Sequence, residues 1–448
     1  MSQASTKPNV ESEIVHDSQR KPAPTRVRYV VLAWACSLAI VTYLCRVGFP
    51  SIMPQLKPQI DLGSRQVGWL MTAFMVAYGI FEIPWGHYGD RKGGRSSLVA
   101  VVVGGSLMTA ALALVIFIRD SPTMALAFLL AARFLFAMFQ AGTFPLLARV
   151  IADWFPLSER GTAQGAVWMA SRLGGAIAPV AFIPLMGIFG NWWIPLLLMS
   201  SLGVVWSVGF WSWFRNKPAE KPTVNEAERA LIAAGRREVK AVHHIPWSGI
   251  FGRTNTLALC LMYGTIGYSG NFVMFFLESY LEKHRHFDPK TAKLLTGLPF
   301  FCGLFACVLG GYLADRLGER LKSRRWGLRI VGGTGLTIAA VGITSTLAVS
   351  NVYWLGVFFC LAMIGNDLAM GPAWSAASQI GERSAGALGG AMNMVGSAFA
   401  ALTGIVTGEQ LAAGDTTTPF ILFGISYLIG ALCWLRIDAE EPMFAEGA

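Results

Sequence analysis

Long apolar stretches separated by short polar breaks run along most of this chain. A helix that crosses the hydrocarbon of a membrane needs about 20 apolar residues, and the breaks carry Pro, Gly, Asn or charged residues, which interrupt helices. The pattern predicts twelve membrane-spanning helices, with the ranges 29–50, 66–86, 96–118, 122–148, 161–186, 191–213, 256–281, 292–314, 327–349, 352–374, 385–409 and 416–436. The expected fold class is therefore an all-α membrane protein.

The polar segments divide these helices six and six. Residues 1–28 are expected to form a disordered cytoplasmic tail, because they lack the apolar segment and cleavage site of a signal peptide. The bundles are predicted at 29–213 and 256–437, with a cytoplasmic tail at 438–448. The loop 214–255 is expected to be a cytoplasmic linker, in which Thr223 and Glu226 have capping-box spacing before a short amphipathic helix.

Composition supports a membrane protein and narrows the function classes. The chain is 54% hydrophobic and 14% charged, whereas a soluble domain carries about 25% charged residues. The seven cysteines lie in apolar segments without zinc-type spacing, so neither a disulfide framework nor a metal site is predicted. No catalytic constellation or nucleotide motif is found, so we expect no enzyme and no cofactor.

The distribution of Lys and Arg predicts the orientation. With the N-terminus in the cytoplasm, the cytoplasmic segments hold 26 of the 36 Lys and Arg residues, seven lie outside and three lie within the membrane. Positive charge favours the cytoplasmic side, so both termini are predicted to be cytoplasmic. The net charge of +10 is explained by this bias and does not indicate a nucleic-acid partner.

The two halves carry an internal repeat. Gly86-His-Tyr-Gly-Asp90-Arg91 ends the second predicted helix, and Gly311-Tyr-Leu-Ala-Asp315-Arg316 ends the eighth, 225 residues later. Glu159-Arg160 recurs as Glu382-Arg383 after 223 residues. Transporters built from such repeats bind substrate between the halves, and the glycines, aspartates and arginines would hold one conformation. The candidate gating residues are Gly86, Asp90, Arg91, Arg95, Gly311, Asp315 and Arg316.

Three arginines, Arg46, Arg133 and Arg172, lie inside apolar stretches with no acidic residue beside them in sequence. A cation within hydrocarbon costs at least roughly 3 kcal/mol, and arginine keeps its proton. An anion that binds and leaves would compensate these charges. The pattern therefore indicates a carrier of negatively charged solutes.

Several motifs resemble the anion:cation symporter branch of the major facilitator superfamily. They are YLCRVGFPSIMP, YGIFEIPWGHYGDRKGGR, RFLFAMFQAGTFP, DWFPLSERGTAQG, GNDLAMGPAW and GGAMN, within a resemblance that covers residues 26–437. The resemblance implies twelve helices in two pseudo-symmetric six-helix bundles. It also implies a kinship with bacterial carriers of hexuronates, galactonate and glucarate.

The resemblance suggests a substrate site. Arg46 and Tyr78 match family positions that contact the substrate's carboxylate and hydroxyls, and Arg133 matches a further arginine. Arg172 stands where sugar-acid carriers often have Gln, and could select a dianion or a compact acid. In the second half the matching positions are Asn366, Trp374, Ser375 and Asn393. Structural ion pairs or helix packing are the alternative roles for these residues.

The chain departs from the family at the residues that handle protons. Family members carry Asp before the first-helix arginine and Glu in the fourth helix, but here these positions are Cys45 and Gln140. Three intramembrane acids remain as coupling candidates, Asp367, Glu82 and Glu278. Asp367 could titrate or pair with an arginine, and Glu82 is expected to join the gate network at the end of its helix.

The sequence therefore predicts a secondary transporter of a small organic anion, such as a hexuronate, aldonate or aldarate. The predicted mode is cation-coupled symport with a proton or sodium ion. The protein is expected to be a monomer among the lipids of the bacterial inner membrane. An anion exchanger or uniporter of the phosphate/organic phosphate type is the alternative, and a non-transporting anion sensor is a further one.

Overall fold

The computed structural model describes residues 23–234 and 244–444, and within these ranges the chain is helical without any strand. Most of the predicted N-terminal tail and the last four residues therefore lie outside the described residues. The first half is formed by α2 (Val27–Gln59), α3 (Ser64–Lys92), α4 (Gly94–Leu112), α5 (Pro122–Gln140), α6 (Thr143–Trp154), α7 (Arg160–Phe189) and α8 (Trp193–Trp213).

The second half repeats this arrangement after a linker that contains α9 (Glu226–Ala233) and α10 (Trp247–Phe251). Its helices are α11 (Thr254–Phe275), α12 (Leu277–Lys283), α13 (Pro289–Arg320), α14 (Arg324–Ser345), α15 (Val352–Leu368), α16 (Met370–Gly381), α17 (Ala385–Ala412) and α18 (Thr418–Cys433). Short breaks separate α5 from α6 and α15 from α16, so the fourth and tenth predicted spans are each interrupted at equivalent places.

The predicted fold class is confirmed. By length and apolar composition, nine helical stretches of the described chain could cross a membrane, or ten if the bent pair of α11 and α12 is one span. The stretch Val352–Ala412 covers two predicted spans, and α18 is a shorter apolar helix. Each of the twelve predicted spans therefore has a helical counterpart.

The linker helix is capped differently from the prediction. Its N-cap is Asn225, whose side chain accepts from the backbone N of Glu228 at 2.9 Å, and not Thr223. The Glu228 carboxylate accepts instead from the Arg28 side chain and from Thr25 Oγ1, at 3.0 and 2.5 Å. These bonds hold α9 against the start of α2. The remainder of the predicted amphipathic helix, beyond residue 234, lies outside the described residues.

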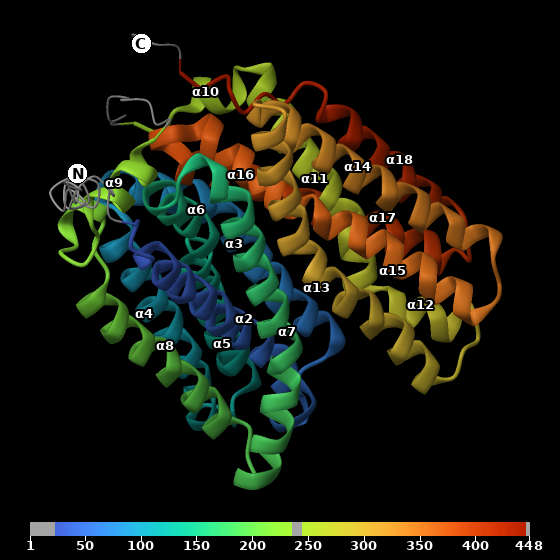
Figure 1. Cartoon of the computed structure of the whole chain (residues 1–448). Coiled ribbons are helices and arrows are strands. Elements are labelled where there is room, and N and C mark those ends of the chain that lie inside the picture. The colour runs from blue at the N-terminus through green and yellow to red at the C-terminus, as the bar shows by residue number, and fades with distance from the viewer. Residues whose placement is uncertain (1–22, 235–243, 445–448) are drawn as a thin grey trace, which may run out of the picture.

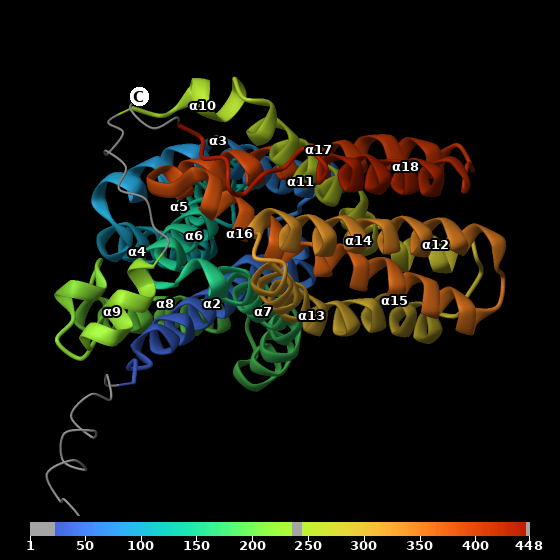
Figure 2. The ribbon, with the colours of Figure 1, turned by 45° about the horizontal axis from the view of Figure 1, so that its top comes forward.

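The two halves converge at the end of the molecule where α9 and α10 lie, here called the linker end, and spread apart away from it (Figures 1 and 2). There α3 packs along α17, and α7 packs along α13. Glycines permit this approach, because a Cβ on Gly86 would overlap the backbone of Gly386, and one on Gly311 would overlap that of Gly161. The 225-residue repeat relates the two glycine pairs.

Candidate functional site

Arg46 of α2 is held by a neutral partner. Its Nε donates to Gln140 Oε1 at 2.9 Å, and Gln140 Nε2 donates to the Thr42 carbonyl at 2.8 Å. The guanidinium lies 4.5 Å from the ring centre of Tyr78 and 5.1 Å from that of Tyr43, and its Nη2 is buried without a hydrogen bond. Gln140 therefore orients Arg46 without cancelling its charge.

Arg133 of α5 lies in an aromatic cage and is 2% exposed. Its guanidinium carbon is 4.4 Å from the ring centre of Phe49, 4.7 Å from that of Phe74 and 5.2 Å from that of Phe136. Such cation–π contacts stabilise a desolvated cation by about 2 kcal/mol. Because Arg133 Nε and Nη1 have no hydrogen-bond partner, the cage leaves two buried donors unsatisfied.

The two arginines belong to one cluster. The ring of Phe74 lies 5.4 Å from the Arg46 guanidinium carbon as well as 4.7 Å from that of Arg133, and it stacks on Tyr78 with centroids 5.6 Å apart. Among the described residues, neither arginine forms an ion pair with an acid. The cluster thus carries two positive charges that no carboxylate pairs with directly.

Arg172 differs from the other two arginines, because it has an acidic partner: of the two roles left open for Asp367, the structure shows the ion pair with an arginine. Arg172 Nη2 of α7 donates to Asp367 Oδ1 of α15 at 2.8 Å, and the Asp367 side chain is fully buried. Asn366 Nδ2 also donates to Asp367 Oδ1, at 2.9 Å, and Tyr427 donates to Asn366. The partner lies 195 residues away in the other half, so its position became visible only in the folded chain.

In the described chain Glu82 bonds across the halves to α17, one helical turn from the Gly86–Gly386 contact, and not to Asp90 or Arg91 as expected. Its carboxylate is fully buried and accepts a hydrogen bond from Asn393 Nδ2 of α17. Asn393 Nδ2 also lies 3.4 Å from the Tyr78 hydroxyl. The reason is the helical turn of α3, which directs Glu82 toward α17 beside Gly390, where a Cβ would overlap the Glu82 backbone.

The other predicted site residues are spread out. Trp374 is fully buried, donates to the Tyr263 hydroxyl at 3.1 Å, and lies 5.6 Å from the ring of Trp168 across the two halves. Ser375 Oγ accepts from Gln379 Nε2 at 2.9 Å, which directs Ser375 toward the linker end. Glu278 lies on the short helix α12, and among the described residues it forms no ion pair with the arginine cluster.

At the linker end, the two repeated aspartates make equivalent contacts across the halves. Asp90 accepts from the backbone N of Gly386 at 3.0 Å and of Ala387 at 2.8 Å. Asp315 accepts from the backbone N of Gly161 at 3.1 Å and of Thr162 at 2.7 Å. Each carboxylate therefore binds the positive end of a helix in the opposite half.

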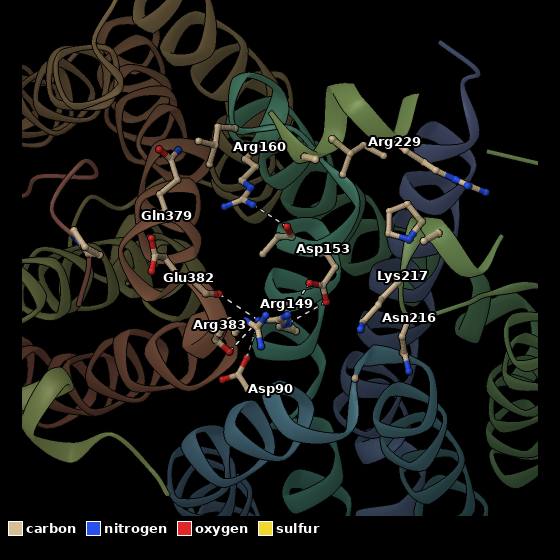
Figure 3. Close-up of a pocket in the computed structure, with 18 of the residues that line it drawn as sticks. Asp90, Arg149, Asp153, Arg160, Asn216, Lys217, Arg229, Gln379, Glu382 and Arg383 are labelled. Atoms are coloured by element: carbon tan, nitrogen blue, oxygen red, sulfur yellow. Dashed lines mark hydrogen bonds and ion pairs between the residues drawn. The ribbon is translucent and has the colours of Figure 1, made fainter. Parts of the chain in front are cut away.

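Arg149, which the sequence reasoning missed, makes the main side-chain bridge here (Figure 3). Its Nη1 donates to the carbonyls of Glu382 and Arg383 at 3.3 and 2.9 Å, and its Nη2 pairs with Asp153 at 2.6 Å. The Arg149 and Asp153 spacing of one helical turn was the available signal. Arg160 also crosses the interface, donating to the Ser378 carbonyl at 3.3 Å.

A cavity of about 1010 Å³ lies at the linker end, and its lining includes Asp90, Arg91, Arg149, Asp153 and Arg160. Two predicted gating arginines bond within their own halves. Arg95 donates to the Trp211 carbonyl at 3.0 Å, and Arg316 donates to the Tyr312 hydroxyl at 3.2 Å. The bridge between the halves thus depends on the aspartates, Arg149 and Arg160, rather than on the two repeated-motif arginines that bond within their own halves.

An all-helical chain with two repeated bundles, packed at one end and carrying buried cations, defines a membrane carrier. Residues 35–404 match the sequence model of the Major Facilitator Superfamily, and the chain belongs to this family. It is a transporter and not an enzyme.

Known proteins support this assignment over nearly the whole chain. A probable sulfoacetate transporter of Cupriavidus necator is 26% identical over 92% of this chain and 94% of its own. A probable L-galactonate transporter of Escherichia coli is 25% identical over 95% and 92%, and the hexuronate transporter of Bacillus subtilis is 24% identical over 90% and 96%. The proton:xylose symporter XylE has the same fold, with a TM-score of 0.72, 14% identity, and coverage of 92% and 98%.

Proposed function

We propose that this protein carries a small organic anion across the membrane by alternating access, and that the anion is a sugar acid or a similarly compact acid. Arg46 and Tyr78 bind the carboxylate, and Arg133 supplies the second positive charge. Arg172, Asn366, Trp374 and Asn393 border this site from both halves. The relatives named as carriers of sulfoacetate, L-galactonate and hexuronate support this class of substrate.

One observation carries the proposal. Arg46 and Arg133 share the ring of Phe74, and three of their buried nitrogens have no hydrogen-bond partner. A buried donor left unsatisfied costs about 1–3 kcal/mol, and more when it is charged. An anion that accepts from these nitrogens removes that cost, and guanidinium groups suit carboxylates because they can bind both oxygens at once.

The direction of opening follows from the charge bias. The excess of Lys and Arg on the linker side supports a cytoplasmic position for that end and for both termini. Because the halves are packed together at this end and Asp90, Asp315 and Arg149 bridge them, we assign the structure to the outward-facing state. Breaking these bridges and the glycine contacts would separate the halves at this end and give the inward-facing state. The membrane is the bacterial inner membrane, and a monomer suffices for this cycle.

Uptake into proteoliposomes tests the proposal. The purified protein should take up radiolabelled galactonate, glucarate, hexuronate or sulfoacetate in a saturable manner, and the unlabelled acids should compete. The Arg46→Ala variant, reconstituted to the same density, is the matched control. If the wild-type protein is folded and inserted but transports none of these acids, the proposed substrate class is wrong.

Anion exchange is the second candidate mode, because Cys45 and Gln140 stand where family symporters carry acids. An exchanger requires an anion inside the liposome, whereas a symporter accumulates substrate from a cation gradient alone. Uptake into liposomes without internal anion, driven by an imposed proton or sodium gradient, excludes exchange. Dependence on internal phosphate or organic acid would exclude symport.

A further inference from the structure

Glu82 lies where the anion cluster meets the interface between the halves. Its side chain is fully buried, Oε1 accepts from Asn393 of the opposite half, and Oε2 has no hydrogen-bond partner. Tyr78, one helical turn away on α3, contacts both Asn393 and the Arg46 guanidinium. Glu82 is thus linked to Arg46 through Tyr78, and to the opposite half through Asn393.

The carboxylate has no direct ion-pair partner among the described residues, because Arg46 donates to Gln140 instead. Burying an unpaired carboxylate costs several kcal/mol. A proton on Oε2 removes that cost, since the neutral carboxyl still accepts from Asn393 through Oε1. Asp367 differs from Glu82, because it already has an ion-pair partner, Arg172, at 2.8 Å.

The surroundings of Glu82 contain few other groups that could take the proton. From α2 it faces Arg46, from its own helix Tyr78, and from α11 Tyr263. The α17 side presents the neutral Asn393, and Asp90 lies two turns further along α3, where it accepts from two backbone N–H groups.

We propose that Glu82 carries the coupling proton of this transporter, in place of the acids that are Cys45 and Gln140 here; this assignment rests on the proposed function. In the outward-facing half of the cycle the carboxylate takes one proton from the outer solution on Oε2, before the surrounding side chains close over it as in this structure. The neutral carboxyl no longer offsets the charge of Arg46, so the anion binds. Proton and anion then cross together, and the proton leaves to the cytoplasm as Glu82 becomes ionised again.

The interface makes access to Glu82 depend on conformation. α3 and α17 approach most closely at Gly390 and at the Gly86–Gly386 contact, which flank Glu82 on the linker side. When the halves separate at that end, Asn393 moves away from Glu82 and its hydrogen bond is lost. The carboxyl is then open to the cytoplasm. Release of the proton there favours release of the anion, and release of the anion favours release of the proton.

Transport by the Glu82→Gln variant tests the assignment, because Gln preserves the size and the hydrogen bond to Asn393 but cannot ionise. If one proton moves with each anion, a gradient of one pH unit supports about tenfold accumulation by the wild-type protein. In Glu82→Gln this ratio should fall to about one, while exchange of external for internal substrate persists. Accumulation by the variant that equals the wild-type ratio would overturn the assignment.

A second measurement is independent of transport. Infrared difference spectra between acidic and alkaline buffer should show the C=O band of a buried carboxyl in the wild-type protein. The band should be absent in Glu82→Gln and present in Asp367→Asn. Its persistence in Glu82→Gln would show that another group takes the proton. A wild-type protein with the Glu82 band but no transport of organic acids would instead contradict the proposed substrate class.

Discussion

Replacement of Arg46 by alanine tests whether this residue binds the anion, separately from its part in the folded structure. Removing one partner of a buried charge pair costs about 3–5 kcal/mol, and Arg46 is only partly buried, so the lower value applies. At 1.4 kcal/mol per factor of ten, 3 kcal/mol corresponds to about a 150-fold rise in Kd. Arg46→Lys keeps the charge but loses the planar fork, and about a tenfold rise is expected.

Folding should survive this change. The Arg46 guanidinium donates to Gln140, lies against the rings of Tyr43, Phe74 and Tyr78, and leaves Nη2 unpartnered. In the alanine variant the loss of these contacts is offset by relief of the repulsion from Arg133. The melting temperature of Arg46→Ala without substrate should lie close to that of the wild-type protein.

Isothermal titration with the purified protein measures the affinity, and uptake into proteoliposomes measures its consequence. Arg215→Ala is the matched control, because within the described chain the Arg215 side chain donates to nearby backbone carbonyls at the end of α8. The control should keep the wild-type Kd. If Arg46→Ala binds the same acid with a Kd within about threefold of wild type while remaining folded, Arg46 does not hold the anion, and the reasoning from unpartnered nitrogens fails.

Three further predictions concern the pairs that the fold brings together. Asp367→Asn leaves Arg172 buried without its acid and should destabilise the protein by about 3–5 kcal/mol. The double variant Asp367→Asn with Arg172→Gln should recover most of the melting temperature. If it does not, loss of the ion pair is not the cause of the destabilisation. Gly86→Val inserts a side chain against the Gly386 backbone and should therefore favour the inward-facing state. A cysteine introduced at the linker end should then be labelled more rapidly, and unchanged labelling would contradict the assignment of the gate. Dianions such as glucarate should raise the melting temperature more than monoanions such as galactonate, and Arg133→Gln should abolish the difference; equal shifts in the wild-type protein would remove Arg133 from the site.

The fold was largely predictable because its determinants are local. Apolar runs, polar breaks and the 225-residue echo of Gly86 and Asp90 are all readable along the chain. The breaks within the fourth and tenth spans were not predicted, because an apolar run does not show where a helix bends. The capping-box spacing predicts Thr223 as the cap of α9, but Asn225 takes that place, and its side chain also accepts from Thr25 in a distant segment.

The partners within the site could not be predicted. The ion pair of Arg172 and Asp367 joins residues 195 positions apart, and nothing along the chain shows which of three arginines an acid will face. The closeness of Glu82 to Asp90 in sequence predicts that Glu82 joins the gate network. Its actual direction depends on how α3 meets α17, which is a property of the packed halves.

The charges of the site become simpler once these pairs are known. Arg172 and Asp367 cancel, so the remaining charges near the anion are those of Arg46 and Arg133, offset by Glu82 when it is ionised. The cluster then carries one positive charge with Glu82 ionised and two with Glu82 protonated. A dianion is neutralised only in the protonated form, so its affinity should depend on pH more steeply than that of a monoanion. The choice of substrate and the coupling to protons would thus be two results of the same carboxyl group.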